Sequence, residues 1–226
     1  RYLPEFREIR SKNQDFIKLC LNENLSSEIT IQPLRRFNID AAIIFSDILL
    51  VPYALGQSVK FKKDFGPLLG EIDFNKMSKI NEIEFIEKLK PVYNAIKKTK
   101  DQEELKNKDL IGFVGAPWTI LVYMLNQKSP KNENIKLNLK DEKFIEDLLK
   151  VIVKFLKIHI NNQIESGATI IQIFDSWAGL LNKKDYDKYI YNPTKELVSF
   201  VRYKKTPVIC FPKGVNDYKS YVSLVK

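Results

Sequence analysis

The chain has 226 residues, of which 44% are hydrophobic and 12% aromatic, and its formal net charge is +9. This composition is typical of a soluble globular chain with a sizeable core. No apolar run reaches the roughly 18–20 residues of a membrane span. The two cysteines, Cys20 and Cys210, lie far apart in apolar segments, which argues against a disulfide framework. We therefore expect a cytoplasmic protein without membrane association.

The positive charge is compatible with a nucleic acid, a membrane surface or a polyanionic small molecule as partner. Many of the lysines lie in Lys/Asn-rich stretches such as residues 128–140, which are typical of solvated loops. Biased composition therefore accounts for much of the charge. The chain lacks the aromatic-rich basic platforms that stack bases, so we expect no nucleic-acid partner.

Four short apolar runs have the character of strands: Ala41–Phe45, Leu110–Val114, Thr169–Phe174 and Val208–Phe211. Each is nearly continuous, as expected for parallel strands that are covered on both faces. Helical periodicity lies between them, over Ile83–Lys98, Phe144–Ile164 and Lys184–Arg202, and a fourth helix is expected to begin near Val215. The alternation predicts an α/β fold with a parallel sheet in one domain, residues 1–226.

The positions of the glycines and the residues at the strand ends indicate which α/β fold the chain adopts. Neither a dinucleotide-binding G-x-G-x-x-G motif nor a P-loop occurs among the eight glycines. Polar or special residues instead follow each strand: Ser46 and Asp47, Gly115 to Thr119, Asp175 and Ser176, and Pro212 and Lys213. A (β/α)8 barrel builds its active site at such strand ends. Because a barrel needs eight strands, typically in about 250 residues, we expect an incomplete portion of a (β/α)8 barrel.

The segment AAIIFSDILLVPYALG, residues 41–56, contains a single charge, Asp47. Burying an ionised carboxylate without partners costs on the order of several kcal/mol. Asp47 either caps the following helix or is a functional carboxylate at the mouth of a barrel. The same alternatives apply to Asp175 and Ser176. Trp118 and Tyr123 are either core packing or surfaces for a ring-shaped ligand.

Arginines are concentrated at Arg1, Arg7, Arg10, Arg35 and Arg36. Guanidinium groups bind carboxylates through two hydrogen bonds at once. Most exposed arginines are only solvated, so each remains a candidate contact for an acidic ligand.

His159 is the only histidine, and it lies in the longest helical pattern near the apolar stripe, which indicates a structural role. A Ser-His-Asp or Cys-His arrangement would need it at a loop or strand end. A zinc site needs about three ligands, and no Cys-x-x-Cys or His-x-Cys motif is present. We therefore expect no metal.

Five segments resemble the uroporphyrinogen decarboxylase family of haem biosynthesis: residues 1–10, 33–56, 112–123, 166–181 and 206–214. The strings RRFNIDAAIIFSDIL and GFVGAPWTILVY are the most specific carriers. The resemblance implies a single distorted (β/α)8 barrel that works as a cytoplasmic homodimer without metal or cofactor. It also implies a polyanionic tetrapyrrole substrate, uroporphyrinogen.

In that family, an Asp at the position of Asp47 accepts hydrogen bonds from the pyrrole N–H groups of the substrate and stabilises a cationic intermediate. The resemblance further implies that Arg1 grips substrate carboxylates and that Tyr123 and Ser176 hydrogen-bond substrate side chains. Phe6 and Phe174 fall where the family has apolar residues near the macrocycle.

Two departures from the family pattern affect this expectation. The residues before Arg1 and after Lys226, which hold the family's first substrate arginine and a late histidine, are absent. We therefore expect a chain truncated at both ends, with part of the site missing and no activity by itself. The alternative is a corrinoid or thiol methyltransferase of the same superfamily. Those relatives bind zinc through His-x-Cys, whereas Cys210 has no histidine two residues before it.

Overall fold

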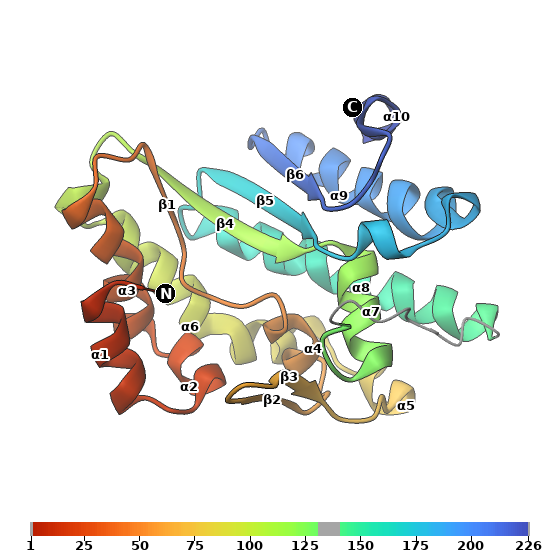
Figure 1. Ribbon diagram of the computed structural model, residues 1–226, viewed down its shortest axis with the longest axis horizontal. Coiled ribbons are helices and arrows are strands. Elements are labelled where there is room, and N and C mark those ends of the chain that lie inside the picture. The colour runs from red at the N-terminus through yellow and green to blue at the C-terminus, as the bar shows by residue number, and fades with distance from the viewer. Residues whose placement is uncertain (1, 131–140, 226) are drawn as a thin grey trace.

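A four-stranded parallel sheet forms the centre of the computed structural model, which describes residues 2–130 and 141–225 (Figure 1). Its strands are β1 (Ala41–Ile43), β4 (Asp109–Gly115), β5 (Ile170–Asp175) and β6 (Val208–Pro212). They lie side by side in the order in which the chain reaches them. A barrel has this sequential order, whereas a doubly wound sheet reverses it at a switch point. All four predicted strands are confirmed.

The two faces of the sheet differ in burial. Side chains on one face, such as Ile171 and Ile173, are 1% exposed or less because helices cover them. On the opposite face, Ile43, Ile209 and Phe211 remain 42–49% exposed. In a closed barrel the opposite face is the packed interior. The sheet is therefore a portion of a barrel wall, as the sequence predicts.

Ten α-helices surround this sheet in the described residues: α1 (Pro4–Lys12), α2 (Phe16–Cys20), α3 (Glu23–Arg36), α4 (Leu50–Ala54), α5 (Phe74–Met77), α6 (Glu82–Lys100), α7 (Pro117–Asn126), α8 (Glu142–Glu165), α9 (Asn192–Tyr203) and α10 (Tyr218–Val225). Figure 1 shows α6, α8 and α9 along the covered side of the sheet. No helix among the described residues is long and apolar enough to cross a membrane.

The long amphipathic patterns predict α6 and α8 to within two residues at each end. Capping side chains determine where these two helices begin. Asn81 accepts a hydrogen bond from the Glu84 N–H at the start of α6, and Asp141 accepts one from the Phe144 N–H at the start of α8. His159 lies on α8, where its Nδ1 is 3.0 Å from the Tyr93 hydroxyl, and burial lowers the pKa of its imidazole to about 3. Its predicted structural role is consistent with this buried, uncharged state.

The helix predicted over Lys184–Arg202 is confirmed, but its first half is not α-helical. The segment divides into a 3₁₀ turn η3 (Lys183–Asp185), a π-helical turn η4 (Asp187–Tyr191) and α9. Pro193, at the start of α9, has no N–H to donate and its ring crowds the carbonyl one turn earlier. The wider π turn, in which the Asn192 N–H reaches the Asp187 carbonyl, accommodates this proline.

Two strands and two 3₁₀ turns are also not evident in the apolar pattern. An antiparallel hairpin, β2 (Val59–Lys62) and β3 (Gly66–Leu69), lies in a stretch that lacks a continuous apolar run. Its turn depends on left-handed backbone at Asp64 and Gly66, with φ of 66° and 87°. Two 3₁₀ turns, η1 (Glu103–Leu105) and η2 (Ala178–Leu180), complete the elements.

Candidate active site

The loops after β1, β4 and β5 leave the sheet at the same edge, because the strands are parallel. Backbone pairing continues past the strands, since the Ala116 N–H donates to the Phe174 carbonyl at 2.8 Å. The turn after β4 requires Gly115, because a Cβ there would lie 2.7 Å from Cδ1 of Ile120 and 3.2 Å from Cβ of Ile48. The predicted polar residues therefore gather at one edge, where a barrel places its active site.

Asp47 is half-buried in the loop between β1 and α4. Its Oδ1 accepts a hydrogen bond of 2.8 Å from the Leu49 N–H, just before α4 begins. Leu49 is itself the N-cap residue of α4 and no side chain caps this helix, so the bond closes a turn before α4 and the capping alternative is wrong for Asp47.

Tyr123 lies on α7 within electrostatic reach of Asp47. Burial raises the pKa of its hydroxyl, the Trp177 indole N–H and the Ser129 hydroxyl lower it, and the negative charge of Asp47 raises it further. The Tyr123 and Trp177 rings meet edge to face, with centroids 6.0 Å apart. Trp177 Nε1 has no hydrogen bond of normal geometry among the described residues. Tyr123 thus stays protonated near neutral pH.

Phe174 lies on the open face of the sheet, in a row of aromatic rings. Its ring centroid is 5.5 Å from Phe113 on β4 and 6.4 Å from Phe211 on β6. Strand register produces the row. Phe174 pairs with Phe211 on β6 and with Gly115 on β4. Phe113 lies two residues before Gly115, so its side chain points to the same face. Sequence reasoning missed Phe113 and Phe211, since only the register shows that they share this face.

Ser176 and Phe6 complete the predicted contacts in the described part of the chain. Ser176 is half-buried directly after β5. Phe6 lies on α1, with its ring 5.8 Å from that of Phe45, which follows β1. Arg1 lies outside the described residues.

Asp175, in contrast, faces away from Ser176 into the helix layer. Its carboxylate is fully buried, and Oδ1 accepts a 2.7 Å hydrogen bond from the Thr119 hydroxyl on α7. Burial raises the pKa of Asp175 to about 7, although the Thr119 bond opposes this. Oδ2 has no partner among the described residues. The capping alternative is wrong here, because no side chain caps the following turn, η2.

Thr119 links Asp175 to the backbone of Trp177. Its Oγ1 accepts from the Trp177 N–H at 3.2 Å, and the neighbouring Trp118 indole donates to the Trp177 carbonyl at 3.0 Å. Helix α7 thereby holds the Trp177 backbone at both its N–H and its carbonyl. The network thereby anchors the residue whose ring packs edge to face against Tyr123.

Two of the candidate arginines are engaged in ion pairs on the helices. Arg35 contacts Glu28 and Glu104, each at 2.7 Å, and these hydrogen bonds raise the pKa of its guanidinium. Arg36 Nε donates to Glu5 at 2.9 Å. Both arginines already have carboxylate partners within the chain. No cluster of three or more His, Cys, Asp or Glu side chains suited to a metal ion occurs in residues 2–130 and 141–225.

Fold and strand-edge residues together define a (β/α)-barrel protein with its candidate site at the carboxyl ends of the strands. The model of the uroporphyrinogen decarboxylase (URO-D) family matches residues 1–223, and the chain belongs to this family. Uroporphyrinogen decarboxylase of Rickettsia bellii (strain RML369-C) is 39% identical over 218 residues, covering 95% of this chain and 64% of the relative. That of Rickettsia felis (strain ATCC VR-1525 / URRWXCal2) is 40% identical over 231 residues, covering 100% and 66%. The chain thus spans just under two thirds of these relatives.

A solved structure, a methyltransferase from Methanosarcina mazei, superimposes with a TM-score of 0.70. The aligned region covers 90% of this chain and 60% of the methyltransferase, at 15% sequence identity. At this identity the similarity establishes the fold alone, and it agrees with the predicted incomplete barrel.

Proposed function

We propose that the protein decarboxylates the four acetate side chains of uroporphyrinogen to give coproporphyrinogen. The relatives at about 40% identity carry the name of this enzyme. The observation that carries the proposal is the electrostatic interaction of Asp47 with Tyr123 at the carboxyl ends of the strands, in a sheet whose open face bears the phenylalanine row of β4, β5 and β6. A carboxylate, a hydroxyl donor and an apolar surface are what a macrocycle with N–H groups and acidic side chains requires.

Asp47 is the proposed catalytic residue. Protonation of a pyrrole carbon beside an acetate group produces a cation, and the electron pair of the breaking C–CO₂ bond flows into it as carbon dioxide leaves. Asp47, accepting hydrogen bonds from the pyrrole N–H groups, stabilises this cation more strongly than the neutral substrate. Stabilisation that is greater in the transition state than in the ground state is what accelerates a reaction.

The remaining proposed contacts orient the substrate. Tyr123, protonated because of its raised pKa, donates to an acidic side chain of the macrocycle, and Ser176 acts in the same way. Phe6 and Phe174 provide apolar surface, and Arg1 binds a carboxylate. The proposal includes a single domain, a cytoplasmic homodimer and catalysis without metal or cofactor, all of which rest on the family resemblance.

The methyltransferase alternative has no specific observation in its favour. The similarity to the Methanosarcina mazei protein concerns the fold alone. Its zinc chemistry would require a histidine near Cys210, whereas the single histidine, His159, is buried on α8 beside Tyr93.

The test compares the variants Asp47→Asn and Asp73→Asn, each made in the full-length gene product. Both aspartates accept one backbone N–H through Oδ1: Asp47 from Leu49 in a turn at 2.8 Å, and Asp73 from Lys76 at the start of α5 at 3.0 Å. Asn caps helices as well as Asp does, so Asp73→Asn should retain activity within about twofold. Loss of the Asp47 charge should lower kcat about 10²- to 10³-fold.

The measurement is formation of coproporphyrinogen and carbon dioxide from uroporphyrinogen in the presence of EDTA. Equal activity of the two variants would show that the Asp47 side chain serves only the turn before α4. Activity that disappears with EDTA and returns with zinc would instead support the methyltransferase alternative.

A further inference from the structure

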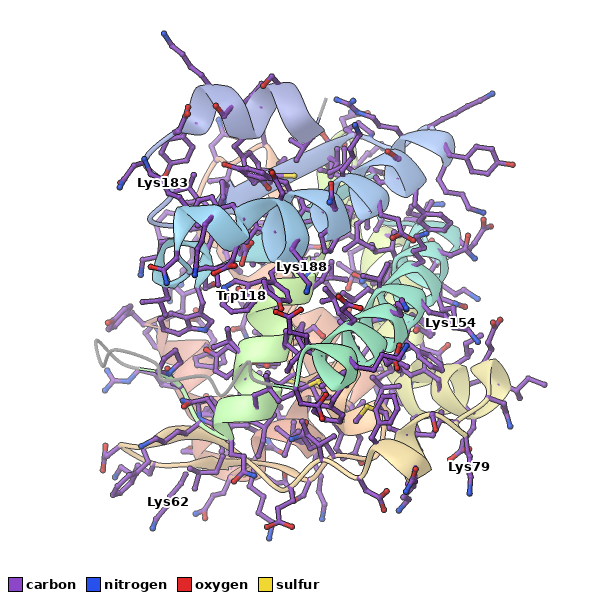
Figure 2. All side chains as sticks on the ribbon, turned by 90° about the vertical axis from the view of Figure 1, so that its right-hand side faces the viewer. Lys62, Lys79, Trp118, Lys154, Lys183 and Lys188 are labelled. Carbon is purple, nitrogen blue, oxygen red and sulfur yellow. The ribbon has the colours of Figure 1, made fainter. Side chains whose placement is uncertain are left out.

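A groove lies on the outer helix layer, on the far side of the sheet from the phenylalanine row. It runs between α8 and the segment formed by η4 and the start of α9, and encloses about 460 Å³. Figure 2 shows Lys188 and Trp118 between these two helical segments, with Lys154 farther along α8. Cavities of about 300–1,000 Å³ are typical of small-molecule sites.

The floor of the groove is apolar. Leu149 and Val153 come from consecutive turns of α8, Tyr189 comes from η4 and Pro193 from α9. The π turn that precedes Pro193 directs Tyr189 inward, where only 3% of it is exposed. π turns are rare, and those that persist often lie at functional sites.

The rim of the groove is basic. Lys150, Lys154 and Lys157 recur at helical spacing along one face of α8, and Lys188 faces them from η4. Four lysines line the groove against two acidic residues, Glu146 and Glu196. Like charges at this spacing on a helix repel one another, so an anion placed between Lys150 and Lys154 would relieve the repulsion between these two side chains.

Lys157 is paired with Glu196, and Lys188 with Glu142 and Glu146. The ion pairs of Lys150 and Lys154, in contrast, are readily exchanged. Lys154 lies 3.4 Å from Glu82, and both side chains are 56% exposed. Lys150 lies 3.4 Å from Asp147 and is 71% exposed. Exposed pairs of this kind contribute little, whereas a ligand carboxylate held over an apolar floor would be partly shielded from water.

From this geometry we propose that the groove binds a small amphipathic monocarboxylate. Its apolar body lies against Leu149, Val153, Tyr189 and Pro193, and its carboxylate lies between Lys150 and Lys154. The proposal concerns a site separate from the proposed decarboxylation site and does not depend on that activity.

The structure also provides a reporter. The Tyr189 ring on the groove floor lies 5.8 Å from the ring of Trp118, which is 2% exposed. The chain has two tryptophans, so Trp177→Phe leaves Trp118 as the single emitter. Its fluorescence then reports on the groove rather than on the open face of the sheet.

The experiment titrates dodecanoate into the Trp177→Phe protein and follows Trp118 emission, with dodecanol as the uncharged control. We expect saturable binding of dodecanoate, with dodecanol at least tenfold weaker. Lys150→Glu/Lys154→Glu should weaken dodecanoate binding at least tenfold. Lys143→Glu, on the same helix and 77% exposed but outside the groove, should change it less than twofold.

Each other outcome overturns the proposal. An absence of saturation, equal affinity for dodecanol, or equal losses in the Lys143 and Lys150/Lys154 variants would each do so. The substituted lysines are exposed, so all variants should retain the circular dichroism spectrum of the parent protein.

Discussion

Asp175→Asn should change how the stability of the protein depends on pH. Asp175 is fully buried, its Oδ2 lacks a partner among the described residues, and burial raises its pKa from 3.8 to about 7. The folded protein therefore binds a proton at this carboxyl that the unfolded chain has already lost above pH 4. Asn has nearly the same shape, accepts from Thr119 in the same way and does not ionise in this range.

The sign and the magnitude of the change in unfolding free energy with pH follow from proton linkage. A raised folded-state pKa means that the contribution of Asp175 to stability is fully present below about pH 4 and is lost as pH rises to about 7. A shift of about 3 units at about 1.4 kcal/mol per unit gives a loss of about 4 kcal/mol. Relative to Asp175→Asn, the wild type should lose about this much free energy of unfolding between pH 4 and pH 8.

The assay is urea unfolding, followed by circular dichroism at half-unit intervals from pH 4.5 to pH 8, on the protein as its gene encodes it. His159, whose pKa is lowered to about 3, opposes the trend, because its stabilising contribution falls as pH drops below about 6.5. Both proteins contain His159, so their difference isolates Asp175. Asp101→Asn, at an exposed carboxylate, serves as the matched control.

Groups near Asp175 set the upper limit of the pH range. The charge of Asp175 raises the pKa values of Tyr186, Cys210 and Tyr221, in each of which burial is the larger cause. They titrate above pH 8 and do not interfere. Profiles of wild type and Asp175→Asn that stay parallel within about 0.5 kcal/mol would refute the reasoning, because the carboxylate would then ionise as it does in water.

Three further substitutions test the edge of the sheet. Thr119→Val should destabilise the protein by about 1–3 kcal/mol in urea unfolding, because Asp175 loses its donor and the Trp177 N–H loses its acceptor; unchanged stability would refute the network. Gly115→Ala should destabilise it in the same assay, since the new Cβ would lie 2.7 Å from Ile120; a neutral result would show that the turn adjusts freely. Tyr123→Phe should lower kcat/KM about 2- to 12-fold, the value of one neutral hydrogen bond, and an unaltered profile of partly decarboxylated intermediates would assign Tyr123 to packing.

The sequence by itself determined the strands, their order and the fold class. Strand and helix patterns are local, because a run such as Leu110–Val114 is apolar whatever it packs against. The polar residues that follow each apolar run were also recognisable in the sequence. Because the strands are parallel, these residues lie at one edge of the sheet. The place of His159 within a helical pattern also predicted its structural role, which its buried position on α8 bears out.

Only the tertiary structure decided which face each side chain occupies. Asp175 and Ser176 are adjacent in the chain, yet Asp175 is buried against α7 whereas Ser176 remains half-exposed at the edge. Strand pairing aligned Phe113 with Phe174 and Phe211. Packing also decided that the helix containing Pro193 begins with the π turn η4 and continues as α9. Register and burial depend on contacts between segments far apart in sequence, and a local pattern does not contain them.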